Sequence, residues 1–218
     1  MMPPRLLAVA PPDWQKRIPQ FREELQQFAR HVAPLGPRAA VYLRAHEVAP
    51  RTWQRWLHAL ELPSLGPVRI GVTAPRGDDG VPFVERSLRM LTAAGVHFVH
   101  LPATRPPARW MLCAGPAPRA IALTRAFHVD GPQDFGSGDP FIDWILVSPV
   151  FPTPTKPGQP ALGLDGLARS IHGKQNHVVA LGGIDAANAR EVLATGVAGV
   201  ACLRAAWSQA PALCAACT

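Results

Sequence analysis

The 218-residue sequence lacks the marks of several specialised classes of protein. Only four cysteines are present. Cys214 and Cys217 have CxxC spacing, but the sequence has no second CxxC and no pair of histidines at zinc spacing. The two cysteines also lie at the C-terminal end, away from any strand-to-helix turn. We therefore interpret them as ordinary thiols on the last helix, not as a redox or metal site.

Long apolar runs and dense charged runs are missing as well. No segment approaches membrane-spanning length, and the apolar run at the N-terminus is too short for a signal peptide, so we expect a cytoplasmic protein with no membrane partner. The formal net charge is +7, with 22 Lys and Arg spread along the chain. This scatter argues against nucleic-acid binding, whereas a small anion such as a phosphate needs only two or three cations.

Apolar, β-rich runs alternate with amphipathic segments along the whole chain, and the apolar content of 48% is ample for a core. The expected strands cover 5–10, 39–45, 68–74, 96–101, 119–127, part of 139–147, 177–183 and 197–203. The expected helices cover 21–32, 50–60, 82–95, 164–173, 185–196 (with Asp185 as its N-cap) and 204–216, with a short helix at best over 105–115.

Eight such strand–helix units favour an α/β fold, a single (β/α)8 TIM barrel domain over residues 1–218. The alternative is an open, doubly wound sheet. That fold would favour a glycine-rich turn after the first strand, and the turn here reads APPDW, with no GxGxxG.

A barrel places its functional side chains at the C-terminal ends of the strands. Two such ends, the glycines after the seventh strand and the residue that opens the helix after the eighth, lie where barrels often bind phosphate. Gly182 and Gly183 let the backbone approach a phosphate closely, and Arg204 can add a charge-assisted bond. The competing interpretation is that paired glycines simply make a tight turn.

Four segments carry a family resemblance. SPVFPTPTKPGQPALGLDGL and VVALGGIDAANAREVLATGVAGVA match it closely, and AGVHFVHLPA and VYLRA match more loosely. With its Phe-Pro-Thr-x-Thr-Lys segment and its Gly-Gly-Ile strand end, the sequence resembles the thiamine phosphate synthase and thiazole tautomerase superfamily of single-domain barrels. The resemblance implies a small phosphorylated thiazole or thiamine-related ligand, and it leaves a homo-oligomer open.

The resemblance also implies roles for particular residues. Thr153 and Thr155 would bind the thiazole phosphate substrate, and Lys156 the pyrophosphate of a pyrimidine substrate. The phosphate of the thiazole would lie against Gly182, Gly183, Leu203 and Arg204. The family usually has serine at the last of these positions, so Arg204 is a departure that either strengthens the phosphate site or obstructs it.

The residues that the synthase needs for pyrophosphate and magnesium depart further. The family's Asn-Asp-Arg after the third strand is replaced by a segment ending at Arg76, with Asp78 and Asp79 displaced by two or more positions. The family's Arg-x-Lys after the second strand is Arg44-Ala45-His46. A serine after the fifth strand is Ala126, and no acid follows the fourth strand closely. These departures argue against metal-dependent synthase chemistry.

The tautomerase branch needs one general acid/base and no metal, and histidine suits that role near neutral pH. The resemblance places His128 there, at the end of the fifth strand, with His46 and His100 as second candidates. We therefore expect no resident metal or other cofactor.

Three hypotheses follow from the sequence. The first is a tautomerase-like enzyme of thiamine biosynthesis in which His128 moves a proton. The second is a divergent synthase that uses Mg²⁺ held by Asp78 or Asp79. The third is a barrel that only binds a phosphorylated metabolite.

Overall fold

A computed structural model of the chain describes residues 1–77, 80–101, 110, 113, 121–128, 142–155, 157–173 and 177–218, with His128 described by its backbone alone. Asp78, Asp79 and Lys156 therefore lie outside the described residues, as does most of the helix expected over 105–115.

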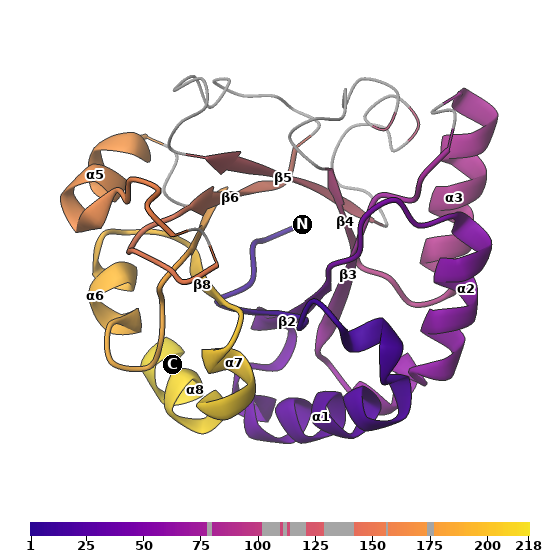
Figure 1. The fold of residues 1–218 in the computed structure, drawn as a ribbon, viewed down its shortest axis with the longest axis horizontal. Coiled ribbons are helices and arrows are strands. Elements are labelled where there is room, and N and C mark those ends of the chain that lie inside the picture. The colour runs from indigo at the N-terminus through magenta and orange to yellow at the C-terminus, as the bar shows by residue number, and fades with distance from the viewer. Residues whose placement is uncertain are drawn as a thin grey trace.

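Eight parallel strands close into a barrel in which each strand pairs with its sequence neighbours and β8 returns to β1 (Figure 1). The expected single (β/α)8 architecture is confirmed, and the open-sheet alternative is wrong because the sheet has no edge. The strands are β1 (Leu6–Val9), β2 (Ala39–Leu43), β3 (Arg69–Thr73), β4 (Phe98–Leu101), β5 (Ala122–His128), β6 (Trp144–Ser148), β7 (Val178–Leu181) and β8 (Gly199–Cys202).

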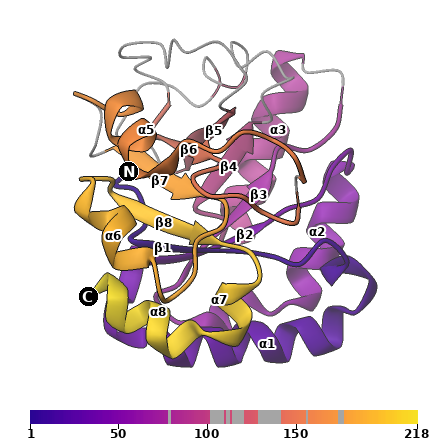
Figure 2. The same cartoon turned by 60° about the vertical axis from the view of Figure 1, so that its left-hand side comes forward.

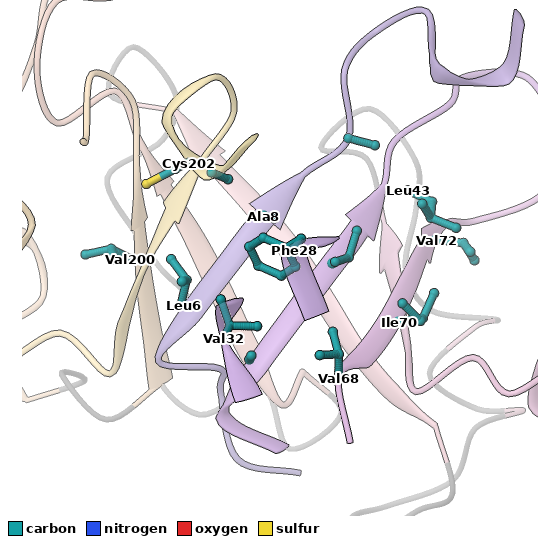
Figure 3. Packing of buried hydrophobic residues seen from close by; sticks show 14 of the residues in the cluster. Leu6, Ala8, Phe28, Val32, Leu43, Val68, Ile70, Val72, Val200 and Cys202 are labelled. Atoms are coloured by element: carbon teal, nitrogen blue, oxygen red, sulfur yellow. The ribbon is translucent and has the colours of Figure 1, made fainter. Parts of the chain in front are cut away.

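The strands are apolar on both faces because a parallel barrel is covered inside and outside. Successive side chains of a strand point to opposite faces, so Leu7 and Val9 of β1 join a cluster inside the barrel. Leu6 and Ala8 instead join the larger cluster between strands and helices. Figure 3 shows these outward-facing side chains beside Phe28 of α1.

Helices surround the barrel on its outside (Figures 1 and 2). The helices are α1 (Ile18–His31), α2 (Pro50–Ala59), α3 (Val81–Ala93), α5 (Gly163–Ser170), α6 (Ala189–Ala194), α7 (Ala205–Ser208) and α8 (Ala210–Cys217). Short 3₁₀ helices η1 (Trp14–Lys16), η2 (Ala33–Arg38) and η3 (Leu62–Leu65) fill some connections. The first and last helices, α1 and α8, lie side by side and complete the ring.

Two of the expected helices differ from those observed. Helix α6 begins at Ala189 and is preceded by a turn that Asp185 caps: Asp185 Oδ1 accepts the backbone N–H groups of Ala187 and Asn188, and its carbonyl accepts that of Ala189. The single helix expected over 204–216 is two helices. Gln209, with φ −130°, is not helical and separates α7 from α8.

The cysteines occur as free thiols, and Cys202, Cys214 and Cys217 are buried. Burial raises the pKa of Cys214 and raises that of Cys217 to about 11, which favours the protonated thiol at both positions of the CxxC pair. This agrees with the interpretation of the CxxC pair as ordinary thiols. No helix in the described part of the chain combines the length and the apolarity needed to cross a membrane.

Candidate active site

A cavity of about 720 Å³ opens at the C-terminal ends of the strands, on the side of the barrel where such folds carry their chemistry. It brings together most of the residues singled out from the sequence, which come from the ends of four strands. The predicted site residues among its lining are Arg44, His46, Thr153, Thr155, Gly182, Gly183, Leu203 and Arg204.

The loop after β6 is joined to the turn after β7 by main-chain hydrogen bonds. The N–H of Val150 donates to the carbonyl of Leu181, and the N–H of Phe151 donates to that of Gly182, both at 3.0 Å. This pairing continues the β6–β7 sheet beyond the last residues of the strands. The loop that carries the threonine motif is therefore fixed by backbone, independently of which side chains it bears.

Gly182 and Gly183 are required by this packing. Both have positive φ, at 105° and 65°, which side chains with a Cβ rarely adopt. A Cβ on Gly182 would lie 2.7 Å from the Cα of Pro149, and one on Gly183 would lie 2.7 Å from the Cβ of Phe151. The missing side chains therefore make room for the β6 loop, which gives weight to the tight-turn interpretation. The turn still borders the cavity.

Thr153 and Thr155 follow directly in the β6 loop and both line the cavity. Thr153 is half-buried and Thr155 is exposed. The Thr153 hydroxyl accepts the backbone N–H of Thr155 at 3.4 Å, which orients the Thr153 side chain. A pair of hydroxyls at a cavity rim can donate to a phosphate or a similar oxyanion.

The turn after β8 adds Leu203 and Arg204 to the same side of the cavity. Arg204 is exposed and is the N-cap residue of α7, a helix of only four residues. Any phosphate contact here would thus rest on the guanidinium and on local N–H groups more than on a helix dipole.

A second cationic group follows β2, the strand diametrically opposite β6 in the closed ring. Arg44 Nε donates to His46 Nε2 at 3.1 Å, so His46 is neutral with its proton on Nδ1. Burial, and then the charge of Arg44, lower the pKa of His46 below its ordinary value of 6.5. The indole of Trp14 donates to the carbonyl of Arg44 at 2.9 Å and so fixes the backbone of this loop.

Two residues of the cavity lining, Tyr42 and His100, each pair with a buried threonine. Tyr42 Oη and Thr73 Oγ1 are 2.9 Å apart, and Thr73 Oγ1 also accepts the N–H of Ala45. The ring of His100 lies 4.9 Å from that of Tyr42, and its Nδ1 is 2.9 Å from Thr124 Oγ1. Burial raises the pKa of Tyr42 to about 12, so its phenol remains neutral and acts through hydrogen bonding and ring contact.

His128 is placed by its backbone at the last residue of β5, in register with Ser148 of β6. Its main chain is therefore at the mouth of the barrel, as expected. Ala126, two residues earlier, lines the cavity.

Several lining residues had not been predicted from the sequence, among them Tyr42, Asp185, Ser208 and Gln209. Tyr42 is the only tyrosine of the chain and occupies an inward-facing strand position. A single polar aromatic in an apolar strand could therefore have marked it as a cavity residue. No feature of the sequence marks Ser208 and Gln209, because they reach the mouth through the break between α7 and α8.

The residues described around the cavity do not suit a bound magnesium ion. Mg²⁺ prefers carboxylate oxygens, and the lining has one carboxylate, Asp185, whose Oδ1 already accepts two backbone N–H groups. Nowhere in the described ranges do three or more Asp, Glu, His or Cys side chains gather in a way that could hold a metal ion.

The fold and the cavity together define a class: a (β/α)8 barrel whose cavity is lined by hydrogen-bond donors and cationic groups at the ends of β2, β6, β7 and β8. Within that class, the sequence profile of the thiamine monophosphate synthase family matches residues 81–206, which is more than half of the chain. The chain therefore belongs to the thiamine monophosphate synthase family.

Individual relatives match over shorter stretches. A thiamine-phosphate synthase of Archaeoglobus fulgidus is 48% identical over 66 residues, which cover 30% of this chain and 31% of the relative. A thiamine-phosphate synthase of Mycolicibacterium smegmatis is 37% identical over 114 residues, which cover 52% of this chain and 49% of the relative. The matched stretches thus span about a third to a half of these relatives.

Among solved structures, the thiamine phosphate pyrophosphorylase from Pyrococcus furiosus superposes with a TM-score of 0.66 at 20% identity, covering 98% of this chain and 95% of that one. At this identity the likeness concerns the fold. The names of the relatives favour the synthase hypothesis over the tautomerase hypothesis.

Proposed function

We propose that this protein is an enzyme of the thiamine phosphate synthase type, which binds a phosphorylated thiazole in the barrel mouth and joins it to a pyrimidine diphosphate. One observation carries the proposal. The cavity gathers the threonine pair of the β6 loop, the β7 turn and Arg204 on one side, with Arg44 on the other. Two oxyanion-binding sides suit a reaction with two phosphorylated substrates.

The reaction makes one bond and breaks one. The lone pair of the thiazole nitrogen forms a C–N bond to the pyrimidine methylene carbon, while the C–O bond breaks and pyrophosphate leaves with its electron pair. Thr153, Thr155 and Arg204 would hold the thiazole phosphate, and Arg44 and His46 would face the leaving group. The apolar lining, with Val9, Leu146 and Leu181, lowers the local dielectric and strengthens these charge interactions.

The test supplies both substrates to the purified protein and measures pyrophosphate release and thiamine phosphate formation. We expect turnover, and Thr153→Val should lower kcat/KM about tenfold, the value of one hydrogen bond to a charged group. Thr92→Val, on the exposed surface of α3, is the matched control and should leave the rate unchanged. No pyrophosphate release at saturating substrate would contradict the coupling reaction.

A second candidate is the tautomerase reaction, a proton transfer that aromatises a carboxythiazole phosphate. The observation that favours it is that the His100 imidazole lines the cavity, where the described lining has one carboxylate. A proton transfer needs an acid/base group such as an imidazole and no metal held by carboxylates. His128 would move the proton, with His100 as the alternative base. Incubation with the thiazole tautomer should give the aromatic absorbance, and an unchanged rate in His128→Asn would exclude the role assigned to His128.

The same assays distinguish the non-catalytic hypothesis from the two enzymatic ones. Calorimetric binding of thiazole phosphate without turnover in either reaction would make the barrel a binding protein for a phosphorylated metabolite.

A further inference from the structure

A side chain that the proposed reaction leaves unassigned lies in the break between α7 and α8. Gln209 is exposed, lines the cavity and has the non-helical φ of −130° that separates the two helices. Its main chain is fully engaged, since its N–H donates to the carbonyl of Ala205 at 2.8 Å and its carbonyl accepts the N–H of Leu213 at 2.9 Å. The backbone that carries this side chain is therefore fixed in both directions along the chain.

The orientation of the Gln209 carboxamide follows from one hydrogen bond. Oε1 accepts the backbone N–H of Ala186 at 3.1 Å, in the turn between β7 and α6. Because a main-chain N–H is a donor, it must face the oxygen of the carboxamide and not the nitrogen. Nε2 is then the free end of the group, and within the described residues it has no hydrogen-bond partner. Its two N–H groups are what Gln209 can offer to a ligand in the cavity.

The charges beside Gln209 give weight to an uncharged donor. Arg204 and Asp185 both line this side of the cavity and carry opposite charges, so together they add no net charge to it. A phosphate held near the β7 turn and Arg204 therefore depends on neutral N–H and O–H donors as well as on the guanidinium. Gln209 Nε2 supplies such donors next to both segments.

The segment that presents Gln209 is tied to the mouth of the barrel. The indole of Trp207 donates to the carbonyl of Val9, the last residue of β1, at 2.9 Å. Ser208 Oγ donates to the carbonyl of Arg204 at 3.3 Å. The bond from Ala186 to Gln209 adds a tie between residues 23 positions apart. A donor that is held in place before the ligand arrives loses little freedom on binding.

We propose that Gln209 is a specificity-determining residue of the phosphate side: its Oε1 holds the β7 turn while its Nε2 donates to a phosphate oxygen of the ligand. This inference rests on the proposed function, because it takes a phosphorylated thiazole as the ligand. Gln209 would thus supply part of the discrimination between a thiazole phosphate and the corresponding alcohol.

The experiment is isothermal titration of the full chain with two probes, the thiazole phosphate and its unphosphorylated alcohol. Gln209→Glu keeps an acceptor for the Ala186 N–H but removes the donor and adds a negative charge. We expect it to weaken the phosphate about a hundredfold and to leave the affinity for the alcohol unchanged. Gln209→Met has neither donor nor acceptor and should weaken the phosphate about tenfold, the value of one hydrogen bond to a charged group.

Two controls separate binding from folding. Gln27→Glu, at an exposed position of α1, changes the net charge equally and should leave both affinities unchanged. Thermal unfolding should give the wild-type Tm for Gln209→Glu, because the bond from Ala186 remains. If Gln209→Met lowers the stability, Gln209→Glu still decides the question.

The outcomes distinguish the inference from the proposed function. If the wild-type protein binds the phosphate no more tightly than the alcohol, the proposed function fails and the inference fails with it. If it does discriminate but both Gln209 variants keep the wild-type ratio of affinities, the inference alone is overturned. The same holds if the two probes weaken equally, which indicates a structural role, or if only Gln209→Glu weakens the phosphate, which indicates charge without a lost donor.

Discussion

The two sides of the barrel mouth are built by different kinds of interaction. On the β6–β7 side, main-chain hydrogen bonds from Val150 and Phe151 fix the loop, and two glycines make room for it. On the β2–β3 side, a main-chain hydrogen bond from Arg76 to Val48 also joins the two loops, but side chains contribute more: Thr73 binds Tyr42 and Ala45, and Trp14 binds the carbonyl of Arg44.

This difference matches the pattern of resemblance. The backbone-built side keeps the family's Phe-Pro-Thr-x-Thr-Lys motif, whereas the side-chain-built side has Arg44-Ala45-His46 and a segment ending at Arg76 where the family has other residues. A side that depends on side chains changes its chemistry with each substitution. A side that depends on backbone geometry keeps its shape as long as its glycines remain.

The largest expected effect breaks the backbone-built side. Gly183→Ala combines a left-handed φ of 65° with a Cβ 2.7 Å from the Cβ of Phe151, so we expect a loss of about 3 kcal/mol in the free energy of unfolding. Urea unfolding followed by far-UV circular dichroism measures it. Gly95→Ala, with φ 79° and nothing within 4 Å, isolates the backbone term and should cost only about 1 kcal/mol. Equal losses of unfolding free energy in the two variants would show that the β6 loop moves away from the added Cβ at little cost.

A smaller effect is expected on the side-chain-built side. Thr73→Val keeps the volume but leaves the buried Tyr42 hydroxyl and the Ala45 N–H without their partner, at a cost of about 2 kcal/mol. Tyr42→Phe removes one member of the pair and should cost about 1 kcal/mol. The same unfolding measurement compares them. A neutral Thr73→Val would mean that water replaces the lost hydroxyl.

The smallest effect concerns the pH dependence of His46. Its pKa in the folded protein lies below the ordinary value of 6.5, so the unfolded chain takes up the proton first as the pH falls. The stability that neutral His46 contributes is present above pH 6.5 and is lost as the pH falls through the lowered pKa. We expect His46→Asn to flatten the decline in stability between pH 7.5 and pH 5.5. NMR titration should also show the pKa of His46 moving toward 6.5 in Arg44→Met; no movement would exclude Arg44 as a cause.

Much of the fold followed from the sequence because strand positions in a parallel barrel need apolar residues on both faces. An apolar run such as residues 197–203 can therefore be recognised as a strand from the sequence alone. Helix ends were less predictable. The break at Gln209 and the start of α6 at Ala189 depend on local backbone conformation, although Asp185 accepts N–H groups just ahead of the helix as its expected capping role requires.

The site followed from the sequence where function requires particular side chains at strand ends. Arg44, Thr153 and Arg204 could be selected in this way once the barrel was inferred. Tyr42 and Gln209 could not, because their place at the cavity depends on the closure of the barrel and on a helix break.

By itself the sequence determined the barrel and the family, since both are set by the alternation of apolar runs and by one local motif. Only the tertiary structure decided what the paired glycines do, because the β6 loop that lies against them comes from more than twenty residues earlier in the chain. It likewise placed the Arg44–His46 pair across the mouth from the threonines. That distance across the ring is set by which strands neighbour one another, a property that no local segment of sequence contains.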